Sequence, residues 1–376
     1  MNSPFERTWK RFKQNKSAVA GLIFIILMVL LCVLGYLITP DDSPQANTMV
    51  LQLTTRKPGS KFTFLNIPAD VKPAKVGLIK KMLFGQQPSS HGIPIAGYQF
   101  KGDSIIVQEF IGEEEPSERM AYSLKLFCDS NDAMRNQQEN IRNNYIQDKT
   151  FWLGTDIYGR DLLSRIILGL RVSFSVGIIA VLISLTLGVL VGSLAGYYGG
   201  KIDLSLSWLM NVIWALPALL LVIAISFALG KGFWQIFVAV GLSMWVEVAR
   251  LVRGQMFTYK NIEFVEAAKA LGFKDSYIIM NHILPNITGP ILVIASSNFA
   301  SAILLEAGLS FLGFGAQPPI PTWGGMIKEH YGYIIMDSAY LAILPGLAIM
   351  LLVYAFNLVA VGLRDAFDVK SQNLNV

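Results

Sequence analysis

Charged residues are scarce in this chain of 376 residues. Lys, Arg, Asp and Glu make up only 15% of it, whereas 53% of the residues are hydrophobic. This composition excludes an ordinary soluble enzyme and indicates an integral membrane protein. Residues 40–150 hold 13 basic and 13 acidic residues and so have no net charge. The net charge of +5 therefore comes from the residues before and after this segment. A basic excess beside apolar runs is typical of a membrane surface, so no nucleic-acid partner is predicted.

Residues that could carry chemistry are equally few. The only two cysteines, Cys32 and Cys128, lie far apart and support neither a disulfide nor a metal site. The three histidines are scattered, and no HExxH motif or Cys/His spacing for a metal occurs. The nearest approach to a phosphate loop, residues 196–201, is one residue too short, and Ile202 stands where Ser or Thr would hold magnesium. The sequence therefore predicts no catalytic, metal or nucleotide site on this chain.

Long hydrophobic runs are abundant. A run of about 20 apolar residues crosses roughly 30 Å of hydrocarbon as a helix. A cleavable signal peptide is the alternative for the first run, but its apolar part is usually shorter and is followed by a small-residue cleavage site. Six transmembrane helices are predicted: Ala18–Ile38, Val172–Tyr197, Leu204–Leu229, Phe233–Val252, Ile287–Phe311 and Ala339–Leu363.

The basic residues of the short loops fall on one side of the predicted membrane. Residues 1–17 carry five of them beside Phe5, Trp9 and Phe12, a pattern typical of an amphipathic helix on a membrane surface. The loop after the fourth run carries five more, whereas short loops on the other side hold only Lys231 and Lys328. Because Lys and Arg are enriched on the cytoplasmic side, both termini are predicted to be cytoplasmic.

Residues 40–150 differ in kind from the rest of the chain. They are polar and balanced in charge, with strand-like runs at Lys61–Ile67 and Ser104–Phe110 and a more helical stretch at Asp129–Gln147. We expect a small mixed α/β subdomain on the extracytoplasmic side, of unassigned function. The predicted organisation is an amphipathic segment 1–17, a transmembrane helix 18–38, the insertion 40–150, a transmembrane core 151–366 with a cytoplasmic loop 261–286, and a cytoplasmic tail 367–376.

Small residues and a proline mark two of the spans. Gly188, Gly192 and Gly196 recur every fourth residue, which places them on one helix face and lets a neighbouring helix approach closely. The alternative is that glycine is simply frequent in membrane helices. Pro217 is predicted to kink the third span. Both features suit a helix that moves.

Two carboxylates lie within predicted spans. Glu306 is near the outer end of the fifth span and Glu247 is a turn before Arg250. Intramembrane carboxylates usually face a bundle interior or a water-filled path. For Glu247 we expect a pair with Arg250 on the same helix, whereas Glu306 is a candidate for the translocation pathway.

The segment from Asn261 to Asn286 predicts two short helices hinged at Gly272. The first helix has an apolar face of Phe264, Ala267, Ala268 and Leu271, recurring at helical spacing. Gly supplies the left-handed residue that commonly ends a helix, and Pro285 forbids simple continuation of the second helix. The expected caps are Asn261 for the first helix and Asp275 or Ser276 for the second.

The same segment carries a recognisable motif. Glu266-Ala267-Ala268, three residues, Gly272, nine residues and then His282-Ile283-Leu284-Pro285 resembles the EAA loop of the membrane subunits of bacterial ABC importers. The general pattern has Ile where His282 stands, but the peptide branch often reads HILPN here. Three further stretches resemble the C-type permease subunits of oligopeptide and dipeptide importers: Leu153–Ser173, Glu306–Ile327 and Leu363–Asp368. The resemblance covers residues 1–38 and roughly 151–368, and leaves residues 40–150 outside.

The resemblance implies a fold and a role. The fold is the all-α type I ABC importer permease with six transmembrane helices, in a bacterial inner membrane. The chain is half of a pore for peptides that works with a homologous second permease, two cytoplasmic ATPases and an extracytoplasmic substrate-binding protein. ATP and Mg are bound by the ATPases, and this chain is not an enzyme. The resemblance assigns the contact with the ATPase to Phe264, Glu266, Ala267, Ala268, Leu271, Gly272, Leu284 and Pro285.

Several interpretations stay open at this point. The turn that holds Asp156, Arg160 and Asp161 is either a tight local turn with Arg160 and Asp161 paired, or part of an outer gate or docking surface. The pore could carry another cargo, such as nickel, a glycoside or a peptide-like antibiotic. The chain could instead be a membrane anchor or receptor whose insertion does the work. An ion-coupled secondary transporter is disfavoured, since few proton sites and no inverted repeat are evident.

Overall fold

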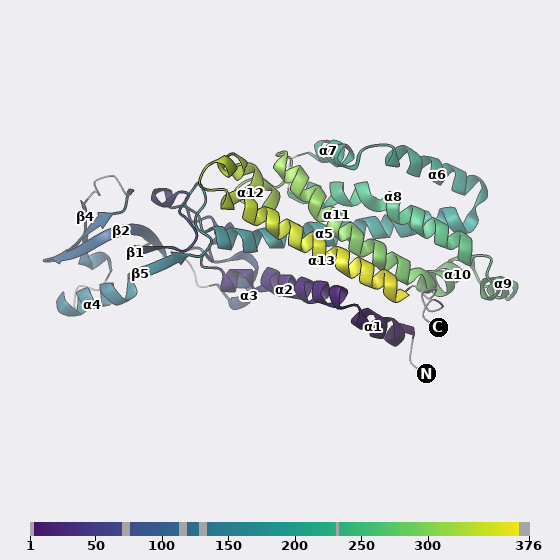
Figure 1. The fold of residues 1–376 in the computed structure, drawn as a ribbon, viewed down its shortest axis with the longest axis horizontal. Helices are drawn as coiled ribbons and strands as arrows, with labels where there is room; N and C mark the ends of the chain where they lie inside the picture. Colours follow the sequence, from purple (N-terminus) through teal and green to yellow (C-terminus); the bar gives the residue numbers. More distant parts are fainter. Residues whose placement is uncertain (1–3, 70–75, 113–118, 128–133, 231–232, 368–376) are drawn as a thin grey trace.

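The computed structural model describes residues 4–69, 76–112, 119–127, 134–230 and 233–367. Long helices form one bundle, and a β-sheet lies beyond one end of it (Figure 1). Most of the predicted tail 367–376, together with Lys231 and Cys128, lies outside the described residues.

Within the described residues, five helices are long and apolar enough to cross a membrane: α2 (Lys16–Ile38), α5 (Leu162–Tyr198), α8 (Phe233–Tyr259), α11 (Thr288–Phe311) and α13 (Tyr340–Phe367). The predicted span Leu204–Leu229 is present as a broken span, with the break at Pro217, where the kink was predicted. It is a pair, α6 (Gly200–Trp214) and α7 (Ala218–Leu229), bent by 95°. Pro217 stands at the break, where its missing N–H and fixed φ prevent a continuous helix. The total is six if the bent pair counts as one span.

Close helix packing holds the bundle together. Gly188 of α5 faces Val248 of α8, and Gly196 faces Met256, so the two helices run side by side in the same direction. α2 packs antiparallel on α13, with Ala18 against Gly362. Three aromatic rings meet in the interior between α5, α11 and α13: Phe299 stacks on Phe356, and Phe174 meets both at a steep angle. These aromatic contacts join helices that lie far apart in the sequence.

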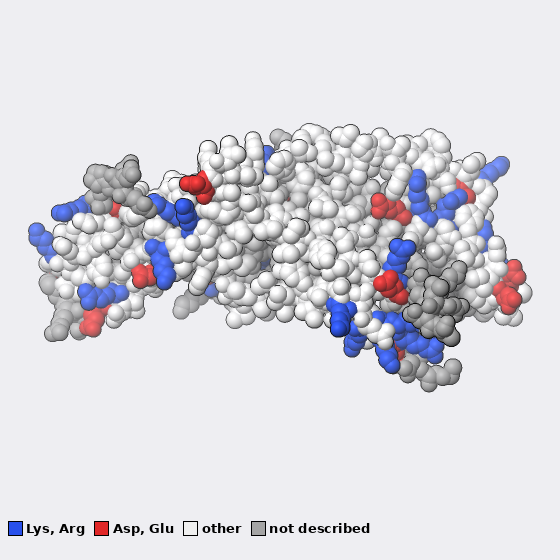
Figure 2. Space-filling view, viewed as in Figure 1, with Lys and Arg blue, Asp and Glu red and all other residues white. Residues whose placement is uncertain are grey.

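The two ends of the bundle differ. α1 (Pro4–Gln14), the end of α13 and the short helices α9 and α10 lie at one end, and the sheet and α12 (Trp323–His330) lie at the other (Figure 1). On the face shown in Figure 2, the middle of the bundle is almost free of charged side chains among the described residues. Such a charge-free band is what a hydrocarbon layer requires.

The sheet contains five antiparallel strands in the order β4-β3-β2-β1-β5. Its core includes Leu65, Ile105, Val107 and Ile141. The predicted strands at 61–67 and 104–110 match β1 and β3 closely, but the helical stretch predicted to Gln147 is wrong at its end, because the chain is already in β5 there. The elements are β1 (Ser60–Pro68), α3 (Leu78–Phe84), β2 (Ser90–Lys101), β3 (Ser104–Glu109), β4 (Arg119–Ser123), α4 (Met134–Asn144) and β5 (Ile146–Phe151).

Candidate functional site

The segment with the EAA motif forms a compact helical hairpin. It contains α9 (Glu263–Ala270), Gly272 at φ +78°, and α10 (Asp275–Ile278). Only glycine adopts that backbone conformation without strain. The predicted caps are wrong: Ile262 and Lys274 occupy the two N-cap positions, and neither makes a side-chain cap bond.

The chain stays helical through Pro285. A π-helical turn, Ile279–Ile283, and a 3₁₀ turn, Leu284–Ile287, connect α10 to α11. Pro285 sits in the first turn of the 3₁₀ segment, where a missing N–H costs little. The proline therefore changes the type of helix at this point instead of ending it.

α9 has one face against the bundle and one face free. Val265 and Ala268 are buried in a cluster with Val252, Met256 and Ile283. Ala268 is only 4% exposed, so its predicted place on the free face is wrong. The apolar residues of α9 extend around more of the helix than the side that is free. Val265 and Ala268, three residues apart and so on the same side of the helix, face the bundle. The free side carries Phe264, Glu266, Ala267, Leu271 and Gly272, with Leu271 at 77% exposure; Leu284 is half-buried and Pro285 exposed.

Both halves of the hairpin hold the last turn of α5. The Tyr197 hydroxyl donates to Asp275 Oδ1 at 2.7 Å, and Lys260 Nζ donates to the Gly196 carbonyl at 3.1 Å. Lys269 Nζ lies 5.2 Å from the centre of the Tyr197 ring. The hairpin is therefore bonded to α5 as well as packed on Val252 and Met256 of α8.

α5 in turn is packed closely on α8. A Cβ at Gly192 would lie 2.5 Å from the Ala249 carbonyl oxygen, and one at Gly196 would lie 2.5 Å from Met256 Cβ. A Cβ at Gly188 would lie 2.8 Å from the Trp245 carbonyl oxygen. The three glycines thus bring the two backbones together over successive turns. With 37 residues, α5 is about 55 Å long and reaches from the hairpin to the opposite end of the bundle.

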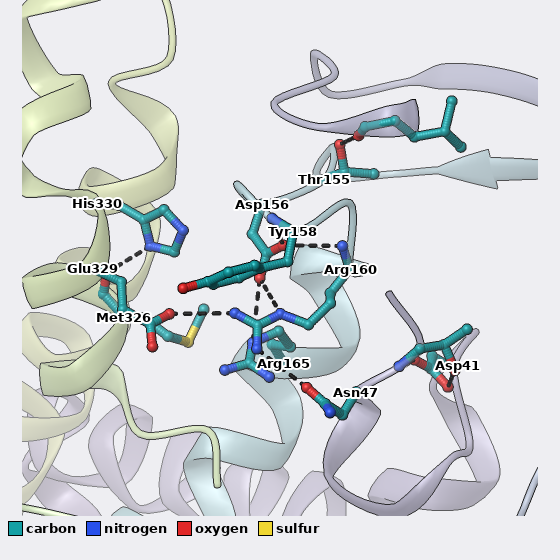
Figure 3. Close-up of polar contacts among 12 residues, drawn as sticks. Asp41, Asn47, Thr155, Asp156, Tyr158, Arg160, Arg165, Met326, Glu329 and His330 are labelled. Atoms are coloured by element: carbon teal, nitrogen blue, oxygen red, sulfur yellow. Dashed lines mark hydrogen bonds and ion pairs between the residues drawn. The ribbon is translucent and has the colours of Figure 1, made fainter. Parts of the chain in front are cut away.

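At that opposite end, the turn before α5 forms a buried ionic cluster (Figure 3). Asp156 Oδ1 accepts bonds from the backbone N–H groups of Tyr158 and Arg160 at 2.8 and 2.9 Å. Asp156 Oδ2 accepts from Arg160 Nε at 2.6 Å. The predicted pair of Arg160 with Asp161 is wrong, because the turn folds Arg160 back onto Asp156.

Arg160 joins three parts of the chain. Its guanidinium donates to Glu329 Oε2 of α12 at 3.3 Å and to Asn47 Oδ1 at 3.2 Å. It also lies 4.4 Å from the centre of the Tyr158 ring, and Arg160 is only 2% exposed. Through these bonds, Arg160 holds together the start of α5, helix α12 and the chain that follows α2.

Asp161 has a separate task. Its Oδ2 accepts from the Ser164 N–H at 2.8 Å and caps α5. Burial raises the pKa of the Asp161 carboxyl, and the bonds from Ser164 oppose this only in part. The Ser164 hydroxyl in turn accepts from the Asp41 N–H at 3.0 Å, which ties the cap to the end of α2.

His330 belongs to the same cluster and was not singled out from the sequence. Its Nδ1 lies 2.6 Å from the Met326 carbonyl and so carries the proton, and burial lowers its pKa. A lone histidine gives no signal in a sequence, whereas its burial beside Glu329 is evident only from the fold.

The structure separates the other two candidate carboxylates from this cluster. Glu306 is fully buried between α11 and α5, where Ser310 Oγ donates to it at 2.7 Å and Ser173 Oγ at 3.3 Å. Glu247 is exposed, and the predicted pair is wrong, because Arg250 donates to Asn211 Oδ1 at 2.9 Å. Within the described ranges, no group of three or more His, Cys, Asp or Glu side chains could hold a metal ion.

Comparison with known proteins identifies the family. A model for binding-protein-dependent transport system inner membrane components matches residues 188–372, and one for the N-terminal transmembrane domain of oligopeptide transport permease C matches residues 3–54. A glutathione transport system permease protein from Pectobacterium atrosepticum is 42% identical over 219 residues, which are 58% of this chain and 72% of the relative. The chain belongs to the family of binding-protein-dependent transport permeases.

Other relatives of this permease carry related names. A dipeptide transport system permease protein from Alkalihalophilus pseudofirmus is 42% identical over 59% of this chain and 73% of its own length. An oligopeptide transport system permease protein from Haemophilus influenzae is 40% identical over 59% and 71%. A solved structure of the inward-facing MetNI methionine ABC transporter has a TM-score of 0.42 at 18% identity, over 55% of this chain and 95% of that chain. The predicted family is confirmed, and the two family models leave residues 55–187 unmatched.

Proposed function

We propose that this permease forms half of the translocation pore of an ABC importer for peptides, with the type I importer fold. The relatives named for dipeptide, oligopeptide and glutathione transport favour a peptide cargo. The observation that carries the mechanism is the free apolar face of α9, which is joined through Tyr197 to the long helix α5. A second, homologous permease would complete the pore.

The membrane placement follows from charge. The end of the bundle with α1 and α9 carries the basic excess of the short loops, so it is the cytoplasmic end in a bacterial inner membrane. Both termini then lie in the cytoplasm. The sheet and α12 lie on the extracytoplasmic side, where a substrate-binding protein delivers the cargo.

The free face of α9 is the proposed contact with the ATPases. Phe264 and Leu271 offer apolar anchors for a groove, and Ala267 lets the partner approach closely. Glu266 is exposed beside them and would pair with a group of the ATPase. ATP and Mg bind to those partner subunits, and closure of the two ATPases would shift the permease between inward- and outward-open states.

The buried ionic cluster of Asp156, Arg160 and Glu329, called the outer cluster below, is the proposed connection between the elements of the outer gate. Asp156 and Arg160 hold the start of α5 to α12, so the two elements would move together when the gate opens. Asp161 keeps the first turn of α5 in place. A pathway role for Glu306 would require its contacts with Ser173 and Ser310 to open during transport.

The test is uptake by the reconstituted importer with Leu271→Asp. A charge on the most exposed apolar residue of the free face should lower ATP-driven uptake about tenfold, the effect of losing one interface anchor. It should weaken copurification of the ATPases and leave the second permease bound. Leu126→Asp, which makes the same change at an exposed leucine of the insertion, is the control. Normal uptake with Leu271→Asp would rule out this contact.

A permease of the same fold for nickel, a glycoside or a peptide-like antibiotic is the alternative. The relatives named above are dipeptide, oligopeptide and glutathione permeases, and the choice among cargoes would rest with the binding protein. Competition of a labelled dipeptide by each compound in the same vesicles distinguishes them.

A further inference from the structure

The short helix α3 carries apolar side chains that the transport mechanism does not use. It lies in the part of the chain that neither family model covers. Leu78 and Ile79 are each 70% exposed, Phe84 is 66% exposed, and Leu83 is also exposed. Single exposed apolar residues are normal, but four of them within one helix of seven residues mark an interaction surface.

α3 is fastened to the end of α2. Gly85, which follows the helix at φ +74°, packs so closely on Tyr36 that a Cβ there would lie 2.8 Å from the Tyr36 ring. Lys81 Nζ pairs with Asp42 Oδ2 at 2.7 Å, and the Gln86 N–H donates to the Asp42 carbonyl at 2.9 Å. These contacts place α3 at the level where the first transmembrane helix ends, as Figure 1 also shows.

α3 is also bound to α5. The Arg171 Nη1 donates to the Leu83 carbonyl at 3.2 Å, and the Arg171 guanidinium lies 5.0 Å from the centre of the Tyr36 ring. The inner side of α3 is thus occupied by α2 and α5. Ile79, Leu83 and Phe84 remain on the outer side.

The surface beside α3 is the lipid-facing side of α2. α2 is the most apolar of the candidate spans, and only 17% of its most apolar stretch is buried. Its last turns expose Leu34, Leu37 and Ile38, so the apolar surface continues from α2 onto α3. Lys80, exposed between these apolar residues, suits the phosphates of lipid headgroups, with its stem lying along the apolar surface.

We propose that α3 is an interfacial helix that inserts Ile79, Leu83 and Phe84 into the leaflet in which α2 ends. The helix thereby fixes the sheet on the membrane surface. That this leaflet is the outer one rests on the topology proposed above, whereas the lipid contact itself does not.

The test places an environment-sensitive fluorophore on α3 in the assembled importer. Cys32 and Cys128 are replaced by Ala, and Leu83→Cys is labelled with NBD in vesicles that contain spin-labelled lipids. We expect blue-shifted emission at position 83 and quenching that is stronger with a shallow than with a deep spin label. Ile38→Cys at the end of α2 is the positive control, and Lys125→Cys on the insertion is the control exposed to water.

Two outcomes would overturn the proposal. Emission at position 83 like that at position 125 would place α3 in water. Blue-shifted emission that spin-labelled lipid does not quench would mean that a protein covers the helix. A second variant, Ile79→Asp combined with Phe84→Asp, should abolish the blue shift at position 83, while uptake measured in parallel reports on the pore independently.

Discussion

At the scale of single residues, the outer cluster concentrates the buried charge of the molecule. Asp156 and Arg160 are almost completely buried and form an ion pair with each other, and Arg160 also bonds to a neighbouring segment. Removing one partner of a buried pair leaves an uncompensated charge, which costs far more than an exposed pair gains.

We therefore expect Arg160→Ala to destabilise the protein by about 3–5 kcal/mol. Asp156→Ala should cost a similar amount, and the double variant should cost less than the sum, because it leaves no unpaired charge between these two residues. Thermal unfolding in detergent measures the stability of the two single variants and of the double variant, with Lys125→Ala as an exposed control. Strictly additive effects would show that the two side chains act independently.

His330 should make stability depend on pH. Its pKa is lowered in the folded state by burial, so the unfolded chain takes up a proton near its ordinary value of 6.5 before the folded protein does. The stabilisation is complete above pH 6.5 and is lost as the pH falls towards the lowered folded value. His330→Gln should unfold at a temperature that falls less steeply below pH 6.5 than in the unmodified protein, and equal slopes would refute this assignment.

At the scale of helices, the contact of α5 with α8 depends on the absence of side chains. The Cβ that Gly192→Ala adds would press on a backbone carbonyl, which cannot move aside without displacing α8. Glycine at these positions therefore serves close packing more than flexibility.

Gly192→Ala should lower stability by about 1–3 kcal/mol, the usual cost of overpacking. Gly254→Ala in α8 is a matched control, because a Cβ there meets nothing within 4 Å. It should be neutral or stabilise by about 0.5–1 kcal/mol through helix propensity. Melting temperatures of the two variants that do not differ would contradict close packing at Gly192.

The sequence predicts these helices well and their contacts less well. Hydrophobic length located every apolar run, and the spacing from Glu266 to Pro285 located the hairpin, because both signals are local. Periodicity could not tell which side of α9 the bundle would take, so Ala268 was misplaced. The break at Pro217 followed from the proline itself. The contacts of Arg160 with Asn47 and Glu329 depend on how distant segments meet, which a single sequence does not encode.

At the scale of the whole molecule, the chain enters and leaves the sheet at one junction with the bundle, and α3 makes a second contact, with the end of α2 and with α5. Ser60 of β1 pairs with Phe151 of β5, so the chain enters and leaves the sheet at neighbouring points. Residues 41–57 and 154–161, by contrast, pack on each other and on the bundle: the Thr155 N–H donates to the Arg56 carbonyl, and Tyr340 of α13 donates to the same oxygen.

Replacing residues 61–150 by two glycines should therefore leave the bundle folded. We expect assembly with the partner subunits, and peptide uptake within about twofold of the full chain, because the contacts of α5 with α8 and of α2 with α13 lie outside residues 61–150. The replacement also removes α3 and its bonds to Asp42 and Arg171, which join the insertion to the bundle and do not hold the bundle helices to one another. Copurification of the partners and uptake in vesicles test this. Loss of uptake by a complex that still assembles would favour the interpretation in which the insertion is the working part.

The parallel course of α5 and α8 has a consequence for how the chain is threaded. When two successive helices run in the same direction, the chain between them has to return from one end of the bundle to the other. Only residues 199–232 are available for that return, and they hold the bent pair α6 and α7. If α5 and α8 both cross the bilayer, the sharply bent pair carries the chain back between them, which agrees with counting the pair as one span and six in all.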